Sequence, residues 1–510
     1  MAKYIMLQGT SSHVGKSILT TALCRIFLQD DYKVVPFKAQ NMALNSYVTK
    51  TGEEMGRAQV AQAEAAGLEP VVEMNPVLLK PTGNSTSQVI LLGKPVGTMS
   101  AKEYHNGYSL TALGVVEKTL EKLSKEYELV VIEGAGSPAE VNLKANDIVN
   151  MRVAKLLNAP VLLIADIDRG GALASIVGTL ELLEPDERDL VKGLIINKFR
   201  GDITLLKPAL DFLEEKTGKP VLGVIPHLDN LGIDDEDSVS LEDKNTVKNI
   251  DQQAEIEIAV LRTPKISNFT DFDSLEVEPD VNLRYVKQGE AIGNPDLIIL
   301  PGSKNTSEDL LYLRTEGYEK ELLALAQQGT PIIGICGGYQ MLGSEIIDPE
   351  KTESSLAKIS GLNLLPMKTV FLGNKITHQI QARTVQNFKF LNQAIFAENL
   401  SGYEIHMGRT EFTQPVLSPF HIEKRSRENV NLVDGVISEN QQILGTYIHG
   451  IFDNDTLRRS LLNAIRSKKG LKPLAVSINI NALKQGSYNR LADTVRNNLD
   501  MKKLMQIMGE

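Results

Sequence analysis

The stretch GICGGYQMLG, residues 334–343, constrains the fold more than any other part of this 510-residue chain. The apolar run before it, residues 331–335, predicts a short buried strand, and a helical pattern begins after Gly337-Gly338. Cys336 therefore lies at a sharp turn from strand to helix, where the helix dipole favours a thiolate and glycine permits a tight backbone. A lone cysteine after a strand is more often a small buried hydrophobe. In this context, however, the pattern predicts a nucleophile elbow with sulfur in place of a serine oxygen.

A second glycine-rich turn, GTSSHVGKS, occupies residues 9–17, between an apolar strand pattern and a helix with one apolar face. This is the context of a phosphate-binding loop, in which backbone N–H groups and the helix N-terminus hold phosphates. Gly15 and Lys16 are expected to bind ATP, with Lys16 neutralising the β- and γ-phosphate oxygens, and the Ser17 hydroxyl is expected to bind Mg²⁺. Five residues separate the two loop glycines instead of the usual four, and dethiobiotin synthetase and its relatives resemble the chain in this respect.

Two further strands of this region end in polar residues. The run at 129–133 ends in Glu133 and a glycine turn, and an acid at the carboxyl end of a parallel strand beside a phosphate loop is well placed to bind Mg²⁺. A helix cap or an ion pair is the alternative role for Glu133. Asn197-Lys198 follows another strand, and an asparagine can both donate to and accept from an adenine edge. We therefore expect Asn197 to contribute to ATP binding.

Alternating strand and helix patterns in both halves predict an α/β protein with two doubly wound, mostly parallel sheets and a helical C-terminal tail. We expect a P-loop synthetase domain at 1–233, a linker at 234–253, a class I amidotransferase domain at 254–456 and a helical extension at 457–510. The extension contains an apolar helical face, which predicts a packed helix or a homo-oligomer interface. Its residues are Tyr488, Leu491, Ala492, Val495 and Leu499.

Composition excludes several classes of protein. The net charge of −10 argues against a nucleic-acid partner, and no apolar run is long enough to predict a membrane partner. Two cysteines are too few for a disulfide framework, and the first residues show no signal-peptide pattern. We expect a cytoplasmic protein.

The cysteine turn and the sequence GTYIHG at 445–450 together resemble the class I glutamine amidotransferases, which hydrolyse glutamine to glutamate and ammonia. The resemblance implies that Cys336 is the nucleophile that forms a glutamyl thioester and that His449 is its general base and acid. It also implies an oxyanion hole from N–H groups near Gly302 and at Gly337. Many members of the family have an acid two residues after the histidine, but this chain has Ile451. The third triad residue is therefore predicted to be absent.

The motifs in their order resemble the cobyric acid synthase family over most of the chain. The resemblance, and nothing in the composition, implies a corrinoid substrate. It implies ATP- and glutamine-dependent amidation of the b, d, e and g carboxylates of adenosylcobyrinic acid a,c-diamide through an acyl phosphate, giving adenosylcobyric acid. In the same way it suggests substrate or phosphate contacts, of which Asp147 is alternatively a helix cap. These residues are Asn41, Asn45, Arg57, Gln59, Lys80 and Asp147.

Three alternative functions remain at this stage. One is cobyrinic acid a,c-diamide synthase, which has the same two halves and chooses different carboxylates. Another is a dethiobiotin-synthetase-like carboxylase, which would not need the Cys336 domain. The third is a non-enzymatic P-loop ATPase switch with an inactive amidotransferase module.

Overall fold

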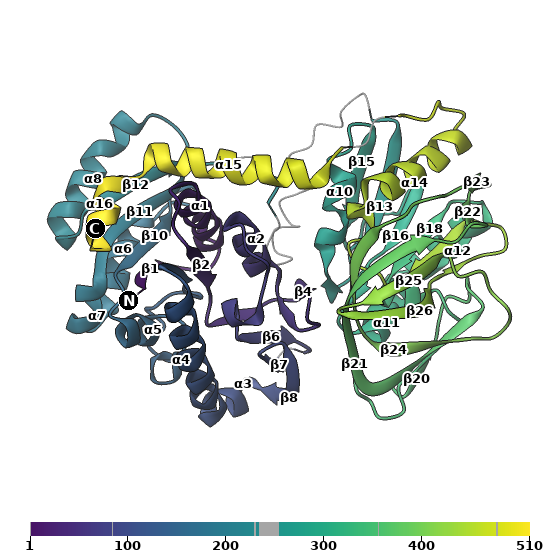
Figure 1. Ribbon diagram of the computed structural model, residues 1–510, viewed down its shortest axis with the longest axis horizontal. Helices are drawn as coiled ribbons and strands as arrows, with labels where there is room; N and C mark the ends of the chain where they lie inside the picture. The colour runs from purple at the N-terminus through teal and green to yellow at the C-terminus, as the bar shows by residue number, and fades with distance from the viewer. Residues whose placement is uncertain are drawn as a thin grey trace. The chain divides into compact units, whose positions relative to one another are not determined.

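The computed structural model describes residues 2–83, 85–228, 231–233, 254–354, 356–475 and 478–509. The chain forms two compact units (Figure 1). The first comprises residues 1–43, 55–234 and 481–510, and the second comprises 44–54 and 235–480. The segment 44–54 thus folds with the later half of the chain, and 481–510 folds with the earlier half. The domain boundaries expected from the sequence are continuous ranges and do not include these two exchanges. The predicted linker 234–253 lies outside the described residues.

The first unit is built on a six-stranded parallel sheet in the order β12-β11-β10-β1-β9-β2. Several of its strands are almost wholly buried, because helices cover both faces of a doubly wound sheet. Its strands are β1 (Lys3–Gly9), β2 (Val34–Phe37), β9 (Leu129–Glu133), β10 (Val161–Asp166), β11 (Val191–Phe199) and β12 (Val221–Pro226).

The helices of this unit alternate with those strands, as Figure 1 shows. They are α1 (Lys16–Gln29), α2 (Arg57–Ala65), α3 (Ala101–Glu103), α4 (Ser109–Glu126), α5 (Met151–Leu157), α6 (Ala172–Leu182), α7 (Pro185–Leu190) and α8 (Ile203–Thr217). Helix α15 (Ile480–Asn498) and α16 (Met501–Ile507) follow near the C-terminus. The predicted apolar face of the tail is buried in the same cluster as the apolar face of α1, which confirms a packed helix.

A smaller sheet of order β3-β6-β7-β8 belongs to the first unit. Its strands are β3 (Gln40–Met42), β6 (Val77–Pro81), β7 (Thr86–Leu91) and β8 (Lys94–Ser100). Short helical turns lie at η1 (Val72–Met74), η2 (Tyr104–Tyr108) and η3 (Lys144–Asn146). The chain leaves β3, forms β4 (Ser46–Val48) in the second unit, and returns through β5 (Glu54–Gly56) to α2.

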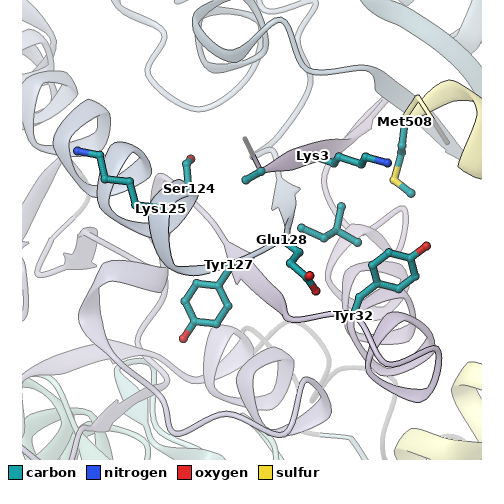
Figure 2. A pocket seen from close by; sticks show the side chains of 9 residues that line it. Lys3, Tyr32, Ser124, Lys125, Tyr127, Glu128 and Met508 are labelled. Carbon is teal, nitrogen blue, oxygen red and sulfur yellow. The ribbon is translucent and has the colours of Figure 1, made fainter.

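One pocket of the first unit, of about 380 Å³, opens at the amino ends of its strands (Figure 2). Lys3 begins β1, and Glu128 and Leu129 lie where β9 begins. Open parallel sheets bind their ligands at the carboxyl ends of the strands, so this pocket lies at the wrong edge for the glycine loop of residues 9–17.

The second unit contains a six-stranded sheet of order β15-β13-β16-β18-β28-β27, parallel except for the edge strand β27. Its strands are β13 (Ile256–Leu261), β15 (Val281–Val286), β16 (Leu297–Leu300), β18 (Ile332–Ile335), β27 (Val436–Ile437) and β28 (Ile443–Thr446). Around it lie η4 (Phe269–Phe272), α10 (Asp273–Glu276), α11 (Thr306–Thr315), α12 (Tyr318–Gln327), α13 (Gly337–Met341), η5 (Ile451–Asp453) and α14 (Asp455–Lys468).

A largely antiparallel sheet completes this unit, with order β20-β19-β21-β25-β26 and with β24 paired to β21. Its strands are β19 (Glu345–Ile347), β20 (Lys358–Ser360), β21 (Met367–Thr384), β24 (Leu400–Phe412), β25 (Phe420–Arg425) and β26 (Glu428–Asp434). Two short pairs are β14 (Ile266–Ser267) with β17 (Gly302–Ser303), and β22 (Lys389–Phe390) with β23 (Gln393–Ala394).

The predicted fold class, two mostly parallel α/β sheets with a helical C-terminal segment, is confirmed. Within the part of the chain that the structure describes, no helix combines the length and the apolar character needed to cross a bilayer.

Candidate active sites

Cys336 lies between β18 and α13, at the strand-to-helix turn that the sequence predicts. Its backbone has φ 51° and ψ −105°, a conformation that non-glycine residues rarely adopt and that costs about 1–3 kcal/mol. The N–H of Cys336 donates to the carbonyl of Thr446 at 2.8 Å, so the turn is anchored to β28. The side chain is 6% exposed, and Sγ lies 3.6 Å from the carbonyl oxygen of Ile405. Strain of this kind is typical of a positioned nucleophile.

His449 follows β28, the strand next to β18, and an acid from elsewhere in the unit holds it in place. Its Nδ1–H donates to Oδ2 of Asp271 at 2.6 Å, and the N–H of Gly450 donates to Oδ1 of the same carboxylate at 2.9 Å. Asp271 belongs to η4 and is 3% exposed. One buried carboxylate therefore orients both the ring and the backbone of the histidine.

The charges around His449 favour its protonated form. Burial alone would lower its pKa, but the Asp271 carboxylate and the nearby Cys336 outweigh burial and raise the pKa to about 10. Nε2 of His449 has no hydrogen-bond partner among the described residues. The second ring nitrogen is thus available for proton exchange beside Cys336.

Tyr403 of β24 forms a wall of this site. Its ring stacks on the ring of His449, with centroids 5.2 Å apart and an interplanar angle of 16°. The two backbones also exchange hydrogen bonds of 3.1 and 2.8 Å. The histidine is therefore fixed on one side by a carboxylate and on a face by an aromatic ring.

The prediction that the site lacks an acid beside His449 is wrong, because Asp271 occupies that position. Ile451, at the position where many amidotransferases have an acid, is buried. The acid comes instead from Asp271, 178 residues earlier in the chain. An acid after the first strand of the second unit, near the carboxyl edge where open sheets gather ligand groups, is the signal that could have suggested it.

Glu404 and His406 lie in β24, and their place in the sequence makes them further candidates for orienting the site, but the structure gives them other partners. Glu404 forms an ion pair with Arg425 at 2.9 Å. The Nδ1–H of His406 donates to the carbonyl of Gly408 at 2.8 Å, and its ring stacks on Tyr447 with centroids 3.8 Å apart. Burial lowers the pKa of His406 to about 3, so it is neutral.

The two glycines expected to form an oxyanion hole lie beside these groups. A Cβ built on Gly302 would be 3.2 Å from Cε1 of His449. A Cβ built on Gly337 would be 2.8 Å from the backbone nitrogen of Ser303, the residue after Gly302. The structure thus brings Cys336, His449, Gly302 and Gly337 together, as one site of the second unit.

The glycine loop of the first unit folds as the sequence indicates. Gly15 has φ 99° and precedes α1, and the buried Lys16 donates from Nζ to the carbonyls of Ser11 at 3.0 Å and Gly136 at 3.1 Å. Asn197 donates to the carbonyl of Val14 at 2.7 Å, so its side chain lies against the loop. These residues surround the space that phosphates would occupy in a loop of this type.

Glu133 lies at the centre of the polar contacts beside that loop. Its Oε1 accepts from Ser17 Oγ and from Lys38 Nζ, both at 2.8 Å, and its Oε2 accepts from Gln62 Nε2 at 2.6 Å. Glu133 is 1% exposed, so these donors compensate a fully buried charge. Among the described residues no three His, Cys, Asp or Glu side chains cluster as a metal site.

The remaining candidate contacts separate into four groups. Asn41 donates to Gln59 Oε1 at 2.9 Å, and Gln59 Nε2 has no partner among the described residues. Arg57 and Lys80 are buried at the start of α2 and in β6. Asp147 accepts from three backbone N–H groups at 2.8, 3.0 and 3.2 Å just before α5, which is a capping role. Asn45 belongs to the second unit, where its Oδ1 accepts from Thr270 Oγ1 at 3.2 Å.

Comparison with known proteins identifies both units. Residues 5–240 match the CobQ/CobB/MinD/ParA nucleotide-binding domain, and residues 257–457 match the CobB/CobQ-like glutamine amidotransferase domain. The cobyric acid synthases of Pelotomaculum thermopropionicum and Moorella thermoacetica are each 56% identical, covering 100% of this chain and 97% and 98% of their own. That of Streptococcus sanguinis is 51% identical, covering 100% of this chain and 99% of its own.

Fold, sites and domain matches together define a glutamine-dependent amidotransferase ligase with its own nucleotide-binding domain. More specifically, the chain belongs to the cobyric acid synthase family, an assignment that the full-length identities of 51–56% establish.

Proposed function

We propose that this protein amidates the b, d, e and g side-chain carboxylates of adenosylcobyrinic acid a,c-diamide to adenosylcobyric acid in cobalamin biosynthesis, using ATP and glutamine. The corrinoid and its four carboxylates come from family membership. The division of labour comes from the two sites: the second unit releases ammonia, and the first activates a carboxylate as an acyl phosphate, which ammonia then attacks.

In the glutamine half, Cys336 attacks the side-chain amide carbonyl of glutamine as a thiolate, its proton having passed to His449. His449, protonated at neutral pH because of Asp271 and Cys336, gives its Nε2 proton to the leaving ammonia. The glutamyl thioester that remains is hydrolysed by water, from which His449 takes a proton. N–H groups near Gly302 and at Gly337 stabilise the oxyanion, an effect of about 3 kcal/mol for each well-placed donor.

In the nucleotide half, Lys16 and the loop N–H groups hold the phosphates of ATP, and Asn197 lies against the loop. The Ser17 hydroxyl and the Glu133 carboxylate are hard oxygen donors in direct contact at 2.8 Å, a set that suits Mg²⁺. When bound there, Mg²⁺ would neutralise charge on the phosphoryl group that is transferred. Glu133 would then bind the cation in place of the hydrogen bond that it accepts from Ser17, while Lys38 keeps its ion pair with Glu133.

The observation that carries the proposal is the Asp271–His449 pair beside the strained Cys336. A buried carboxylate, an imidazole and a thiol in this order form a cysteine nucleophile with its base and orienting acid. This arrangement argues against the alternative of an inactive amidotransferase module that serves only as a platform.

Cys336→Ala tests the glutamine half. Glutamine-dependent amidation should fall by about 10³ or more, because the nucleophile is lost, whereas amidation with ammonium chloride should continue. The measurement is mass spectrometry of the corrinoid a,c-diamide incubated with ATP and Mg²⁺. Four successive gains of one amide each support the proposal. Amidation of cobyrinic acid at two positions instead would identify the sister diamide synthase, and retained glutaminase activity in the variant would refute the role of Cys336.

A further inference from the structure

Asp309, a buried acid in the first turn of α11, has no part in the function proposed above. Its side chain is 1% exposed, and aspartate is rarely buried to this extent unless it is paired. Oδ2 of Asp309 accepts from the hydroxyl of Ser303 at 2.6 Å, and Oδ1 accepts from the backbone N–H of Lys265 at 3.0 Å. The carboxylate therefore links two segments that are 38 residues apart in the chain.

These two segments form the short ladder of β14 and β17. Lys265 directly precedes β14, Ser303 ends β17, and Ile266 is paired with Ser303 in antiparallel register. The N–H of Lys304 also donates to the carbonyl of Lys265 at 2.9 Å. A two-stranded ladder of this length is not stable by itself, so the link through Asp309 contributes to holding the two strands in place.

The hydroxyl of Ser303 lies between the carboxylate and the start of α11. It donates to Asp309 and accepts from the backbone N–H of Asn305 at 3.1 Å. Asn305 is the N-cap of α11, where its side chain accepts from the N–H of Glu308 at 3.1 Å. Burial raises the pKa of Asp309 to about 6, so at neutral pH the carboxylate is ionised and can only accept. The direction of the Ser303 hydroxyl is thus fixed by both neighbours.

The backbone of residues 302–303 lies against the reactive groups of the proposed glutaminase site. A Cβ built on Gly302 would be 3.2 Å from Cε1 of His449. A Cβ built on Gly337, the residue after Cys336, would be 2.8 Å from the backbone nitrogen of Ser303 and 3.0 Å from its Cβ. No side chain fits between these backbones, so the position of residues 302–303 sets the distance from their N–H groups to a reacting carbonyl.

We propose that Asp309 is a positioning residue for glutamine hydrolysis, and that it acts through the Ser303 hydroxyl to hold residues 302–303 where their backbone stabilises the oxyanion. The proposal rests on the proposed function, since it assumes that Cys336 attacks glutamine at this place. In this role Asp309 does not bind the substrate itself. Oxyanion donors must lie about 2.7–3.1 Å from the oxyanion, and a misplacement of about 1 Å can lower the rate about 10²-fold.

Two variants break the link while keeping the backbone. Ser303→Ala removes the hydroxyl and retains the N–H of residue 303. Asp309→Asn keeps the shape of the side chain and replaces one acceptor oxygen with an NH₂ donor. The double variant tests whether the two residues act as one unit.

Thr384→Val is the matched control. Thr384 is 1% exposed in β21 of the same unit. Its hydroxyl also lies between a donor and an acceptor, since it accepts from the N–H of Ala397 at 2.9 Å and donates to the carbonyl of Ala397 at 3.3 Å. The control therefore removes a buried hydroxyl with the same kinds of partners as that of Ser303.

The experiment measures kcat and KM for glutamate release by the full chain with Mg-ATP and corrinoid a,c-diamide, together with the thermal midpoint. In each single variant kcat should fall by about 10- to 100-fold, with KM for glutamine within about twofold, because an oxyanion donor acts in the transition state. The double variant should lose no more than the weaker single variant, since both break the same link. Thr384→Val should lower the thermal midpoint and keep kcat within about twofold.

Three outcomes would overturn the proposal. The first is a lower thermal midpoint with unchanged kcat in Ser303→Ala or Asp309→Asn, which would make the link purely structural. The second is a double variant in which the two losses multiply, and the third is an equal loss of kcat in Thr384→Val. Failure of the proposed function is a separate result, because glutamate release would then survive Cys336→Ala.

Discussion

The two candidate active sites differ in how their reactive groups are partnered. In the proposed glutaminase site, His449 is fixed at Nδ1 by Asp271, while Nε2 has no partner within the described residues and Cys336 lies beside it. In the nucleotide site, Lys16 donates to two loop carbonyls and Glu133 accepts from three side chains. In the first site one buried ring nitrogen of His449 is left without a partner among the described residues, whereas in the second site the charges have protein partners.

The difference has a physical reason. A cysteine nucleophile needs one fixed geometry, and a protein can supply all of its orienting groups. A phosphate loop handles a ligand with several negative charges, and its own buried cation and carboxylate would be costly if left unpaired. Nucleotide binding must therefore replace hydrogen bonds that Lys16 and Glu133 make within the protein. Glutamine binding need not break the hydrogen bond between Asp271 and His449.

The largest effect is expected from Asp271→Asn, which breaks the assembled site. The amide cannot stabilise an imidazolium or hold the same tautomer, and loss of such an acid lowers kcat by about 10³–10⁴. Ammonia-dependent amidation should be unaffected. Asp273→Asn, two residues along at the start of α10, is the control and should retain glutaminase activity.

The same variant has a signature in the pH profile. Since Asp271 raises the pKa of His449 to about 10, the unchanged protein keeps the imidazolium below that pH and loses activity as pH rises through it. Without the carboxylate the pKa falls, so the alkaline limb of kcat/KM should move to lower pH. A limb that stays in place would show that Asp271 does not act on His449 charge.

The sequence alone predicts those parts of each site whose residues lie close together along the chain. Cys336 with its two glycines, and the loop of residues 9–17, each lie within one strand-turn-helix unit, so their geometry follows from short-range rules. Asp271 could not be found in this way, because 178 residues separate it from His449 and only the tertiary fold of the second unit brings them together. The placement of 44–54 in the second unit was missed for the same reason, since a short polar stretch carries no period that reveals its tertiary partner.

Glu133→Gln tests the internally partnered site and should have an intermediate effect. It removes the carboxylate that would bind Mg²⁺ and leaves Lys38 without its buried counter-charge. We expect ATP-dependent amidation, with either nitrogen source, to fall by about 10². Glutaminase activity measured without ATP should survive.

The control for this variant is Glu73→Gln, which breaks a partly exposed ion pair with Lys122 in the same unit. The rate of amidation by this variant should stay within about twofold of that of the unchanged protein, because exposed ion pairs contribute little to stability. If Glu133→Gln instead keeps full amidation and only lowers the thermal midpoint, Glu133 is a structural ion-pair partner and the magnesium role is refuted.

The smallest effect is expected from Gly15→Ala. This variant tests whether the nucleotide loop already has its folded conformation before the nucleotide binds. Gly15 has φ 99°, and an added Cβ would lie 2.1 Å from Nδ2 of Asn197. Backbone strain and displacement of Asn197 should together lower the free energy of unfolding by about 1–3 kcal/mol. They should also raise KM for ATP, because Asn197 can no longer lie against the loop.

Gly114→Ala provides a control of opposite sign. Gly114 lies within α4, where an added Cβ meets nothing within 4 Å, and alanine in a helix is more stable than glycine by about 0.5–1 kcal/mol. The thermal midpoint should therefore fall in Gly15→Ala and rise in Gly114→Ala. The KM for ATP should change only in Gly15→Ala. Equal thermal midpoints in the two variants would mean that the loop is pliable, and that the nucleotide shapes it on binding.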